Sequence, residues 1–195
     1  MRKIQNKTVK RIIFFASGSG TNVANIIKYF NGNDKVEVAL TLTNNPNSGV
    51  IKRVKKMKKP CIVFSKHELE GKSLLQKIIS INPDLIILAG FLLKIPANFV
   101  NAFPKKIINI HPALLPKFGG RGMYGNRVHQ SVKDSSEEKT GITIHFVNEF
   151  FDQGTIIFQA SVLIEDNDTV EDIANKVHKL EYAHYPRIID QLLFS

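Results

Sequence analysis

The feature that most constrains the fold is a regular alternation of short apolar segments with amphipathic ones along the first 111 residues. The apolar segments have few polar positions, which is typical of strands buried on both faces of a parallel sheet. We therefore predict right-handed strand–helix–strand units whose helices cover both faces of that sheet. The predicted strands are residues 11–16, 36–42, 62–64, 85–89 and 107–110.

Three helices are predicted between these strands, the last of them over residues 69–79. The second contains the densest basic run, residues 52–59. Its lysines are expected to fill the solvent side of the helix, because no aromatic residues are interleaved to stack on nucleic-acid bases. The net charge of +10 then acts as a long-range field that attracts anions. The apolar faces are Val23, Ile26, Ile27 and Phe30 in the first helix and Ile51, Val54 and Met57 in the second.

The last third of the chain has a different pattern. Residues 140–147 alternate between two faces, and a second β-rich segment at 155–164 follows Gly154, which predicts an antiparallel addition. A closing helix is expected over 170–192. The 195 residues fit one domain without disulfides or structural metal. We therefore predict a single α/β domain with a mostly parallel, Rossmann-like sheet and antiparallel strands near its C-terminus.

Cysteine content and apolar runs indicate the compartment. The single cysteine, Cys61, excludes an intramolecular disulfide and a cysteine-based zinc site, and its apolar surroundings indicate a buried structural thiol. No apolar stretch approaches the ~20 residues needed to span a bilayer. Residues 1–10 are basic and polar, and the apolar residues 12–16 end too soon for a signal-peptide core. We expect a cytoplasmic protein.

A glycine-rich loop, residues 18–22, joins the first strand to the first helix. Glycines let a backbone approach a ligand closely, and a helix N-terminus offers unpaired N–H groups and partial positive charge. The third glycine of a dinucleotide fingerprint is replaced by Val23, and no acidic residue stands at the end of the second strand. The loop therefore favours a phosphate monoester over NAD, and a tight turn that binds nothing is the alternative.

The fifth strand ends in Asn109 and His111, followed by a proline. Residues at i and i+2 of a strand point to the same side, so both side chains are expected at the carboxyl edge of the sheet. An amide donor beside a titratable ring suits an oxygen that gains negative charge while a proton moves. The alternative is a strand end whose histidine caps a loop. Asp152, in a turn before Gly154, is either a turn former or a partner of His111.

Two further pairs are candidates. His145 shares a strand face with Thr143, and either lines the same cavity or is a core histidine with satisfied hydrogen bonds. His178 and Glu181 lie one turn apart on the last helix, where they bind sugar hydroxyls or form a plain surface contact. A metal site is not expected, because no His-Glu-x-x-His motif is present.

Six segments together resemble the phosphoribosylglycinamide formyltransferases, a family of folate-dependent formyltransferases of purine biosynthesis. They occur in the family's order between residues 11 and 190. Each is weak alone, and the ordered set at this length is specific. The segments are 16–22 (ASGSGTN), 88–91 (LAGF), 109–116 (NIHPALLP), 141–147 (GITIHFV), 151–154 (FDQG), and Glu181 with Tyr185-Pro186.

The resemblance implies transfer of a formyl group from 10-formyltetrahydrofolate to the amine of glycinamide ribonucleotide, without metal. It places phosphate binding in about residues 11–105 and catalysis with folate binding in about 85–195. Asn109 and His111 would stabilise the oxyanion, Asp152 would raise the proton affinity of the imidazole and assist proton transfer, and Thr143 and His145 would support them. The implied substrate-binding residues are Gly20, Thr21, Asn22, His178 and Glu181, and the implied folate-binding residues are Leu92, Leu93, Lys94, Ile95, Asn148, Glu149, Phe150, Phe151 and Asp152.

Some positions depart from the family pattern. Leu93 stands where many relatives carry a basic residue, so Lys72 and Lys94 are both candidates for the folate glutamate tail. The loop 118–125 differs from the shorter version in some relatives, and Tyr182 stands where a histidine is common.

Other activities stay open at this point. They are a formyltransferase for methionyl-tRNA or an amino sugar, a formyltetrahydrofolate hydrolase, and a non-catalytic folate or phosphate sensor. A formyltransferase for methionyl-tRNA is expected to need a second, RNA-binding domain. A formyltetrahydrofolate hydrolase is expected to need an extra amino-terminal domain. The presence of Asn109, His111 and Asp152 together disfavours a non-catalytic sensor. We expect small-molecule substrates, no nucleic acid or membrane partner, and a monomer or homodimer.

Overall fold

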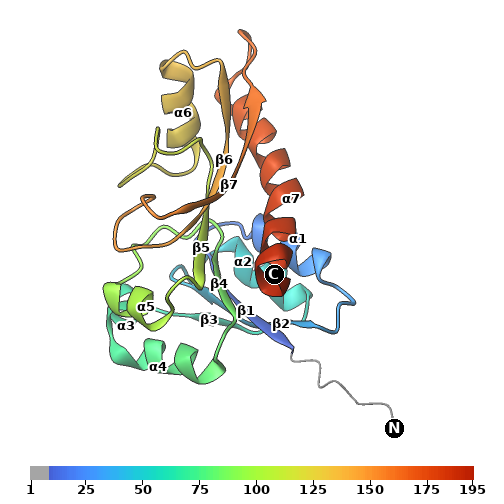
Figure 1. Cartoon of the computed structure of the whole chain (residues 1–195), viewed down its shortest axis with the longest axis vertical. Coiled ribbons are helices and arrows are strands. Elements are labelled where there is room, and N and C mark those ends of the chain that lie inside the picture. Colours follow the sequence, from blue (N-terminus) through green and yellow to red (C-terminus); the bar gives the residue numbers. More distant parts are fainter. Residues whose placement is uncertain (1–8) are drawn as a thin grey trace.

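The computed structural model describes residues 9–195, which form one seven-stranded sheet in the order β3-β2-β1-β4-β5-β6-β7 (Figure 1). The first five strands are parallel, whereas β6 is antiparallel to both β5 and β7. The mostly parallel α/β sheet with an antiparallel addition is thereby confirmed. The strands are β1 (Lys10–Phe15), β2 (Val36–Thr43), β3 (Cys61–Val63), β4 (Leu85–Leu88), β5 (Ile107–His111), β6 (Lys139–Phe146) and β7 (Ile156–Leu163).

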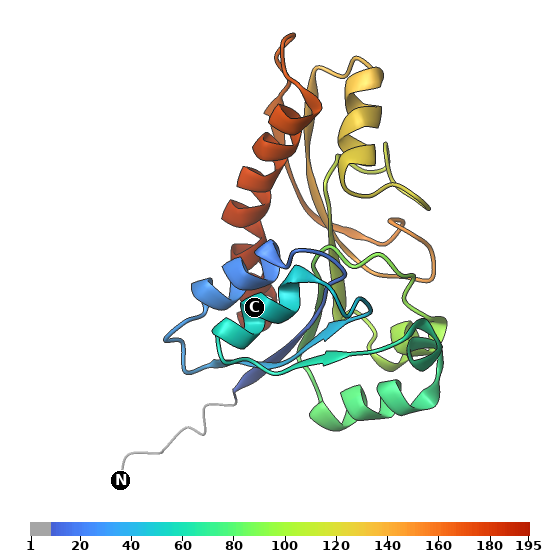
Figure 2. The ribbon, with the colours of Figure 1, turned by 180° about the vertical axis from the view of Figure 1, so that it is seen from behind.

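Helices cover both faces of the parallel part, and alternate β1 residues face the two layers (Figures 1 and 2). Ile12 and Phe14 pack in one buried cluster with α1, α2 and α7, and Ile13 and Phe15 pack in the other with α3, α4 and α5. The hairpin β6–β7 extends beyond this part and is flanked by α6 and α7. The helices are α1 (Thr21–Tyr29), α2 (Gly49–Lys56), α3 (Lys66–Glu70), α4 (Lys72–Ile81), α5 (Ala97–Ala102), α6 (Asn126–Asp134) and α7 (Val170–Phe194).

The prediction of one helix over 69–79 is wrong. Two helices stand there, because Gly71 is extended (φ −81°, ψ 173°) and Ser65 with Glu68 forms a capping box that starts α3 earlier. The helices α5 and α6 had no counterpart in the sequence prediction. The first is only six residues long, and the second is mostly polar, with Val128 and Val132 as its only aliphatic residues, so neither contains an apolar run that marks a helix.

The basic helix α2 has the expected amphipathic character. Val50 and Val54 are its fully buried residues, with Ile51 and Met57 partly buried, and its basic side chains lie on the solvent side. Cys61 is only partly buried, and this burial raises the pKa of its thiol. No helix within residues 9–195 has the length and apolar character needed to cross a membrane. The expectation for residues 1–10 falls, except for the last two, outside the described range.

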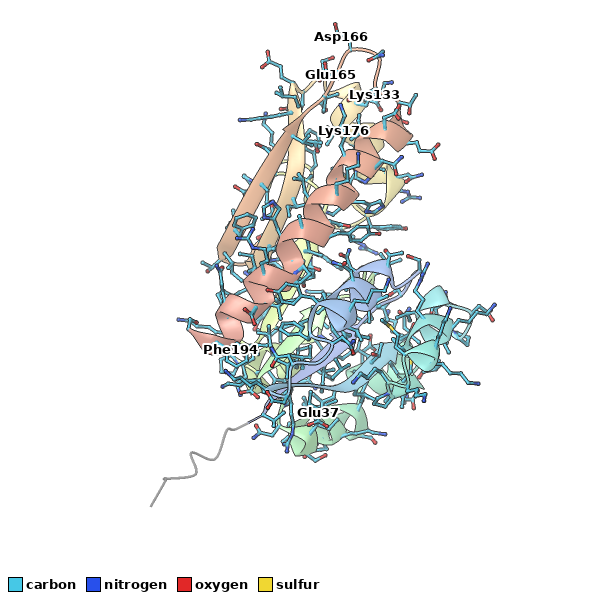
Figure 3. The ribbon with its side chains drawn as sticks, turned by 90° about the vertical axis from the view of Figure 1, so that its right-hand side faces the viewer. Glu37, Lys133, Glu165, Asp166, Lys176 and Phe194 are labelled. Atoms are coloured by element: carbon cyan, nitrogen blue, oxygen red, sulfur yellow. The ribbon has the colours of Figure 1, made fainter. Side chains whose placement is uncertain are left out.

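At the far end of the hairpin, two lysines contact the acidic loop between β7 and α7 (Figure 3). Lys176 pairs with the Asp168 carboxylate, and Lys133 donates to the Asp168 carbonyl at 2.7 Å. Thr169 caps α7 in a capping box with Asp172. These contacts join α6, β7 and α7 at a distance from the carboxyl ends of the parallel strands.

The strand order leaves a crevice at the carboxyl ends of the parallel strands. The chain turns from β1 to β2 and β3 on one side, whereas β4 and β5 lie on the other side of β1. The loops that leave the carboxyl ends of β1 and β4 therefore diverge and leave a crevice, where open α/β sheets bind ligands.

Candidate functional site

A cavity of about 1080 Å³ lies at this crevice, and the residues that line it come from most of the chain. It contains the glycine loop, the segment after β4, the end of β5 and part of α7. Its lining residues are Gly18, Ser19, Gly20, Thr21, Asn22, Lys66, Leu69, Glu70, Ala89, Gly90, Phe91, Leu92, Leu93, Lys94, Asn109, Ile110, His111, Pro112, Gly120, Arg121, Gly122, Met123, Tyr124, Gly125, Asn126, His129, Phe151, Asp152, His178 and Glu181.

The glycine loop forms the open N-terminus of α1. Gly20 has φ +75°, and a Cβ built on it would lie 2.5 Å from the Val50 side chain, so both conformation and space require glycine. The helix has no side-chain N-cap and no acidic residue in its first turn. The N–H groups of that turn have no intrahelical acceptor, so they can bind an anion in the cavity.

Asn109, His111 and Asp152 meet in the cavity. The Asp152 carboxylate lies 3.4 Å from Asn109 Nδ2 through Oδ1 and 3.5 Å from His111 Nδ1 through Oδ2. Asp152 Oδ2 also accepts a 2.9 Å hydrogen bond from the Gly120 amide. Asp152 adopts φ +56°, a left-handed conformation that Asp tolerates better than most residues. The hypothesis that the turn folds back onto His111 is confirmed by this geometry.

Both ring nitrogens of His111 face oxygen atoms. Nε2 lies 2.8 Å from the Phe118 carbonyl, and Nδ1 faces Asp152. Burial lowers the pKa of His111, and the charge of Asp152 and the Phe118 carbonyl oppose this without cancelling it. Asp152 thus acts in the expected direction, but the pKa of the ring lies below its ordinary value. Burial raises the pKa of the Asp152 carboxyl, and the His145 and His111 rings with the Gly120 amide outweigh it, so the pKa is lowered.

His145 and Thr143 lie on β6, directly opposite Asn109 and His111 in the sheet. His145 is 2% exposed, and its Nδ1 lies 2.8 Å from the Phe146 carbonyl. Its Nε2 lies 3.2 Å from Asn109 Nδ2 and 3.6 Å from Asp152 Oδ1. His145 is therefore a core histidine with satisfied hydrogen bonds, and it contacts Asn109 and Asp152 from β6. Thr143 accepts from the Leu115 amide and donates to the Ala113 carbonyl, which fixes the chain after His111.

The other end of the cavity joins α1 to α7. Glu181 Oε2 lies 2.8 Å from His178 Nδ1 and accepts a 2.9 Å hydrogen bond from Asn22 Nδ2. The hydrogen bond to Glu181 raises the pKa of His178. Asn22 Oδ1 is buried and has no hydrogen-bond partner among the described residues. The pair that the helical spacing predicted is thus in contact, and Glu181 also contacts Asn22 of the glycine loop.

Comparison with known proteins assigns the chain to a family. A family model described as formyl transferase matches residues 10–189. The chain belongs to the formyl transferase family. Relatives named phosphoribosylglycinamide formyltransferase include the Bacillus subtilis protein, 35% identical over 191 residues, which are 95% of each chain. The chloroplastic protein of Arabidopsis thaliana is 38% identical over 92% of this chain. The chain spans only 64% of the Arabidopsis relative and 61% of its Vigna unguiculata counterpart.

Solved structures agree with this family. The phosphoribosylglycinamide formyltransferase of Bacillus halodurans superimposes with a TM-score of 0.85 at 33% identity, covering 95% of this chain and 96% of that protein. Glycinamide ribonucleotide transformylase 1 of Geobacillus kaustophilus gives a TM-score of 0.85 at 32% identity, covering 95% and 99%. The Rossmann-like fold predicted for the chain is therefore that of solved formyl transferases.

The residues implied for folate binding are divided between two cavities. Leu92, Leu93, Lys94, Phe151 and Asp152 line the large one. Ile95, Glu149 and Phe150, with Lys94 again, line a second cavity of about 260 Å³. Asn148 lines neither of these cavities. Its side chain donates to the Gln153 carbonyl and accepts from the Phe150 amide, within its own turn. Of the two candidates for the glutamate tail, Lys94 lines the large cavity and Lys72 does not.

Sequence reasoning missed several lining residues of this formyl transferase. Lys66 and Glu70 come from α3, whose start was not predicted, and His129 comes from α6, which was not predicted at all. No local pattern distinguishes them from surface residues. Among residues 9–195, no group of three or more His, Cys, Asp or Glu side chains could hold a metal ion.

His129 predicts acid sensitivity of the fold. It is 2% exposed, its Nδ1 has no partner among the described residues, and burial with the charge of His178 lowers its pKa. Below about pH 6.5 the unfolded chain therefore binds a proton that the folded chain does not, so stability falls as the pH falls. We expect His129→Gln to flatten the fall in unfolding free energy between pH 7 and 5, by at most about 1.4 kcal/mol per pH unit. Urea titrations at each pH measure the slope, and an unchanged slope would contradict this.

Proposed function

We propose that this chain transfers the formyl group of 10-formyltetrahydrofolate to the amine of glycinamide ribonucleotide, a step of purine biosynthesis. The observation that carries the proposal is the single cavity that joins an anion-binding helix terminus, a buried glutamate and the Asn109–His111–Asp152 cluster. A phosphorylated sugar with an amine needs these three features in one continuous space. The names of its relatives favour the same acceptor.

The phosphate would bind the N–H groups of Gly20, Thr21 and Asn22 at the start of α1. The ribose hydroxyls would donate to Glu181, which His178 and Asn22 hold in place. The amine then extends toward the end of β5.

The chemistry needs a developing negative charge to be stabilised and a proton to be moved. The acceptor nitrogen attacks the formyl carbon, and the carbonyl oxygen becomes negative in the tetrahedral intermediate. Asn109 Nδ2 and a protonated His111 would donate to that oxygen. For His111 to do so, its Nε2–H must leave the Phe118 carbonyl that it now faces. Asp152, through water, would accept the proton of the attacking nitrogen and return one to the departing folate nitrogen.

The folate donor is a cosubstrate that enters from the β4 side. The segment 92–94, with Phe151, would hold its pterin ring beside the reacting formyl group. Lys94 is the lysine in the cavity wall best placed for the acidic tail, because it lines both cavities. No step requires a metal or a covalent enzyme intermediate.

The proposal is tested by absorbance-monitored formyl transfer from a 10-formylfolate donor with and without glycinamide ribonucleotide. We expect donor consumption that depends on the ribonucleotide. Consumption without it would indicate a hydrolase instead. No consumption in either case would overturn the proposed reaction and direct the test to amino sugars and methionyl-tRNA.

A further inference from the structure

Three consecutive carbonyl groups before α1 accept hydrogen bonds from one segment, residues 45–53. Asn45 Nδ2 donates to the Ser17 carbonyl at 3.5 Å, and the Val50 amide donates to the Gly18 carbonyl at 3.2 Å. The third and shortest is from Arg53 Nε to the Ser19 carbonyl, at 2.9 Å. The start of α2 and the loop before it therefore hold the oxygen side of the glycine loop.

This arrangement fixes which way the loop amides point. In a planar trans peptide, the carbonyl and the following N–H point in opposite directions. When Arg53 holds the Ser19 oxygen toward α2, the Gly20 N–H is turned away from α2. The loop lines the cavity and Arg53 does not, so this N–H is turned to the cavity side. The same contact keeps a carbonyl oxygen away from a bound anion, which it would repel.

The packing between α2 and the loop makes the contact specific to Arg53. A Cβ on Gly49 would lie 3.1 Å from the Ser19 carbonyl oxygen, so the first turn of α2 lies directly on the loop. Arg53 is one turn further along the same face of the helix. The other basic residues of α2, Lys52, Lys55 and Lys56, make no hydrogen bond to the loop among the described residues. A guanidinium donor makes this bond charge-assisted and adds positive charge behind the loop.

We propose that Arg53 is a positioning residue for the acceptor's phosphate. It orients the Ser19–Gly20 peptide so that the N-terminus of α1 presents N–H groups, and only N–H groups, to the phosphate. The role rests on the proposed function, because it assumes that the glycine loop binds the phosphate of the acceptor. It gives one member of the basic run a function that the general charge of the chain does not supply.

The first test compares Arg53→Gln with Lys56→Gln, which removes the same charge from the same helix face without touching the loop. In formyl-transfer kinetics, we expect Arg53→Gln to raise the KM for the ribonucleotide about five- to tenfold, as for loss of a charge-assisted hydrogen bond at an exposed site. Its kcat and its KM for the folate donor should stay within about twofold. Lys56→Gln should change neither KM by more than about twofold. Equal effects of the two variants would reduce the role of Arg53 to general charge and overturn the inference.

The second test does not depend on catalysis. Inorganic phosphate is titrated into the unliganded protein, and the amide resonances of Gly20, Thr21 and Asn22 are followed by NMR. We expect saturable shifts in the wild type and in Lys56→Gln, and a Kd weakened about five- to tenfold in Arg53→Gln. Equal Kd values in all three proteins would overturn the role of Arg53 alone. Absence of shifts at these amides in the wild type would overturn the phosphate site as well.

Discussion

Replacing Asn109 by alanine is expected to lower kcat for formyl transfer by at least about 100- to 1000-fold, the range for loss of one oxyanion donor. The Asn109 amide is held in place before substrate binds, because His145 Nε2 and Asp152 Oδ1 both lie within 3.4 Å of Nδ2. Nδ2 carries two hydrogens, so one of them must leave its present acceptor to donate to the formyl oxygen as that oxygen becomes negative. Initial rates at saturating donor and acceptor measure the loss.

The control is Asn98→Ala, on α5, outside both cavities. Dissociation constants for the ribonucleotide should be similar in wild type and Asn109→Ala, because the phosphate and ribose contacts that we propose lie on α1 and α7. A turnover number within a few-fold of the wild-type value would exclude Asn109 as the oxyanion donor. A large rise in the ribonucleotide Kd would instead show that Asn109 binds the ground state.

Local sequence patterns were sufficient to predict the strands and the side of β5 on which the side chains of Asn109 and His111 lie. The period of two along β5 places Asn109 and His111 on one side, and the position of the glycine loop after β1 places that loop in the same cavity. Both follow from backbone geometry within a few residues. The helical spacing of His178 and Glu181 likewise predicts their contact.

The rest of the site depends on contacts that no local pattern contains. Asp152 reaches His111 only because β6 pairs with β5 and the turn after β6 adopts a left-handed conformation at Asp152. His129 lines the cavity from α6, whose mostly polar sequence contains only two aliphatic residues. The net pKa of His111 could not be predicted either, since it depends on how far burial outweighs one carboxylate. Each of these is a long-range packing result.

Replacing Asp152 by asparagine is expected to lower kcat by about 100- to 10,000-fold, the range for loss of a positioned acid–base group. Asparagine tolerates the left-handed backbone at this position, and its carbonyl oxygen can still accept from the Gly120 amide. The change therefore removes the charge and the proton acceptor with little effect on shape. Asp166→Asn, in the loop at the far end of the hairpin (Figure 3), is the control and should leave kcat unchanged.

The pH profile separates the two roles of this carboxylate. In the wild type, the charge of Asp152 raises the pKa of His111 against the larger effect of burial. Without that charge the pKa of His111 falls further, so the protonated ring is lost at lower pH. If a protonated His111 stabilises the oxyanion, the alkaline limb of kcat in Asp152→Asn must move to lower pH. A reduced kcat with an unmoved alkaline limb would show that Asp152 acts in proton transfer alone, and that the neutral ring of His111 is the catalytic form.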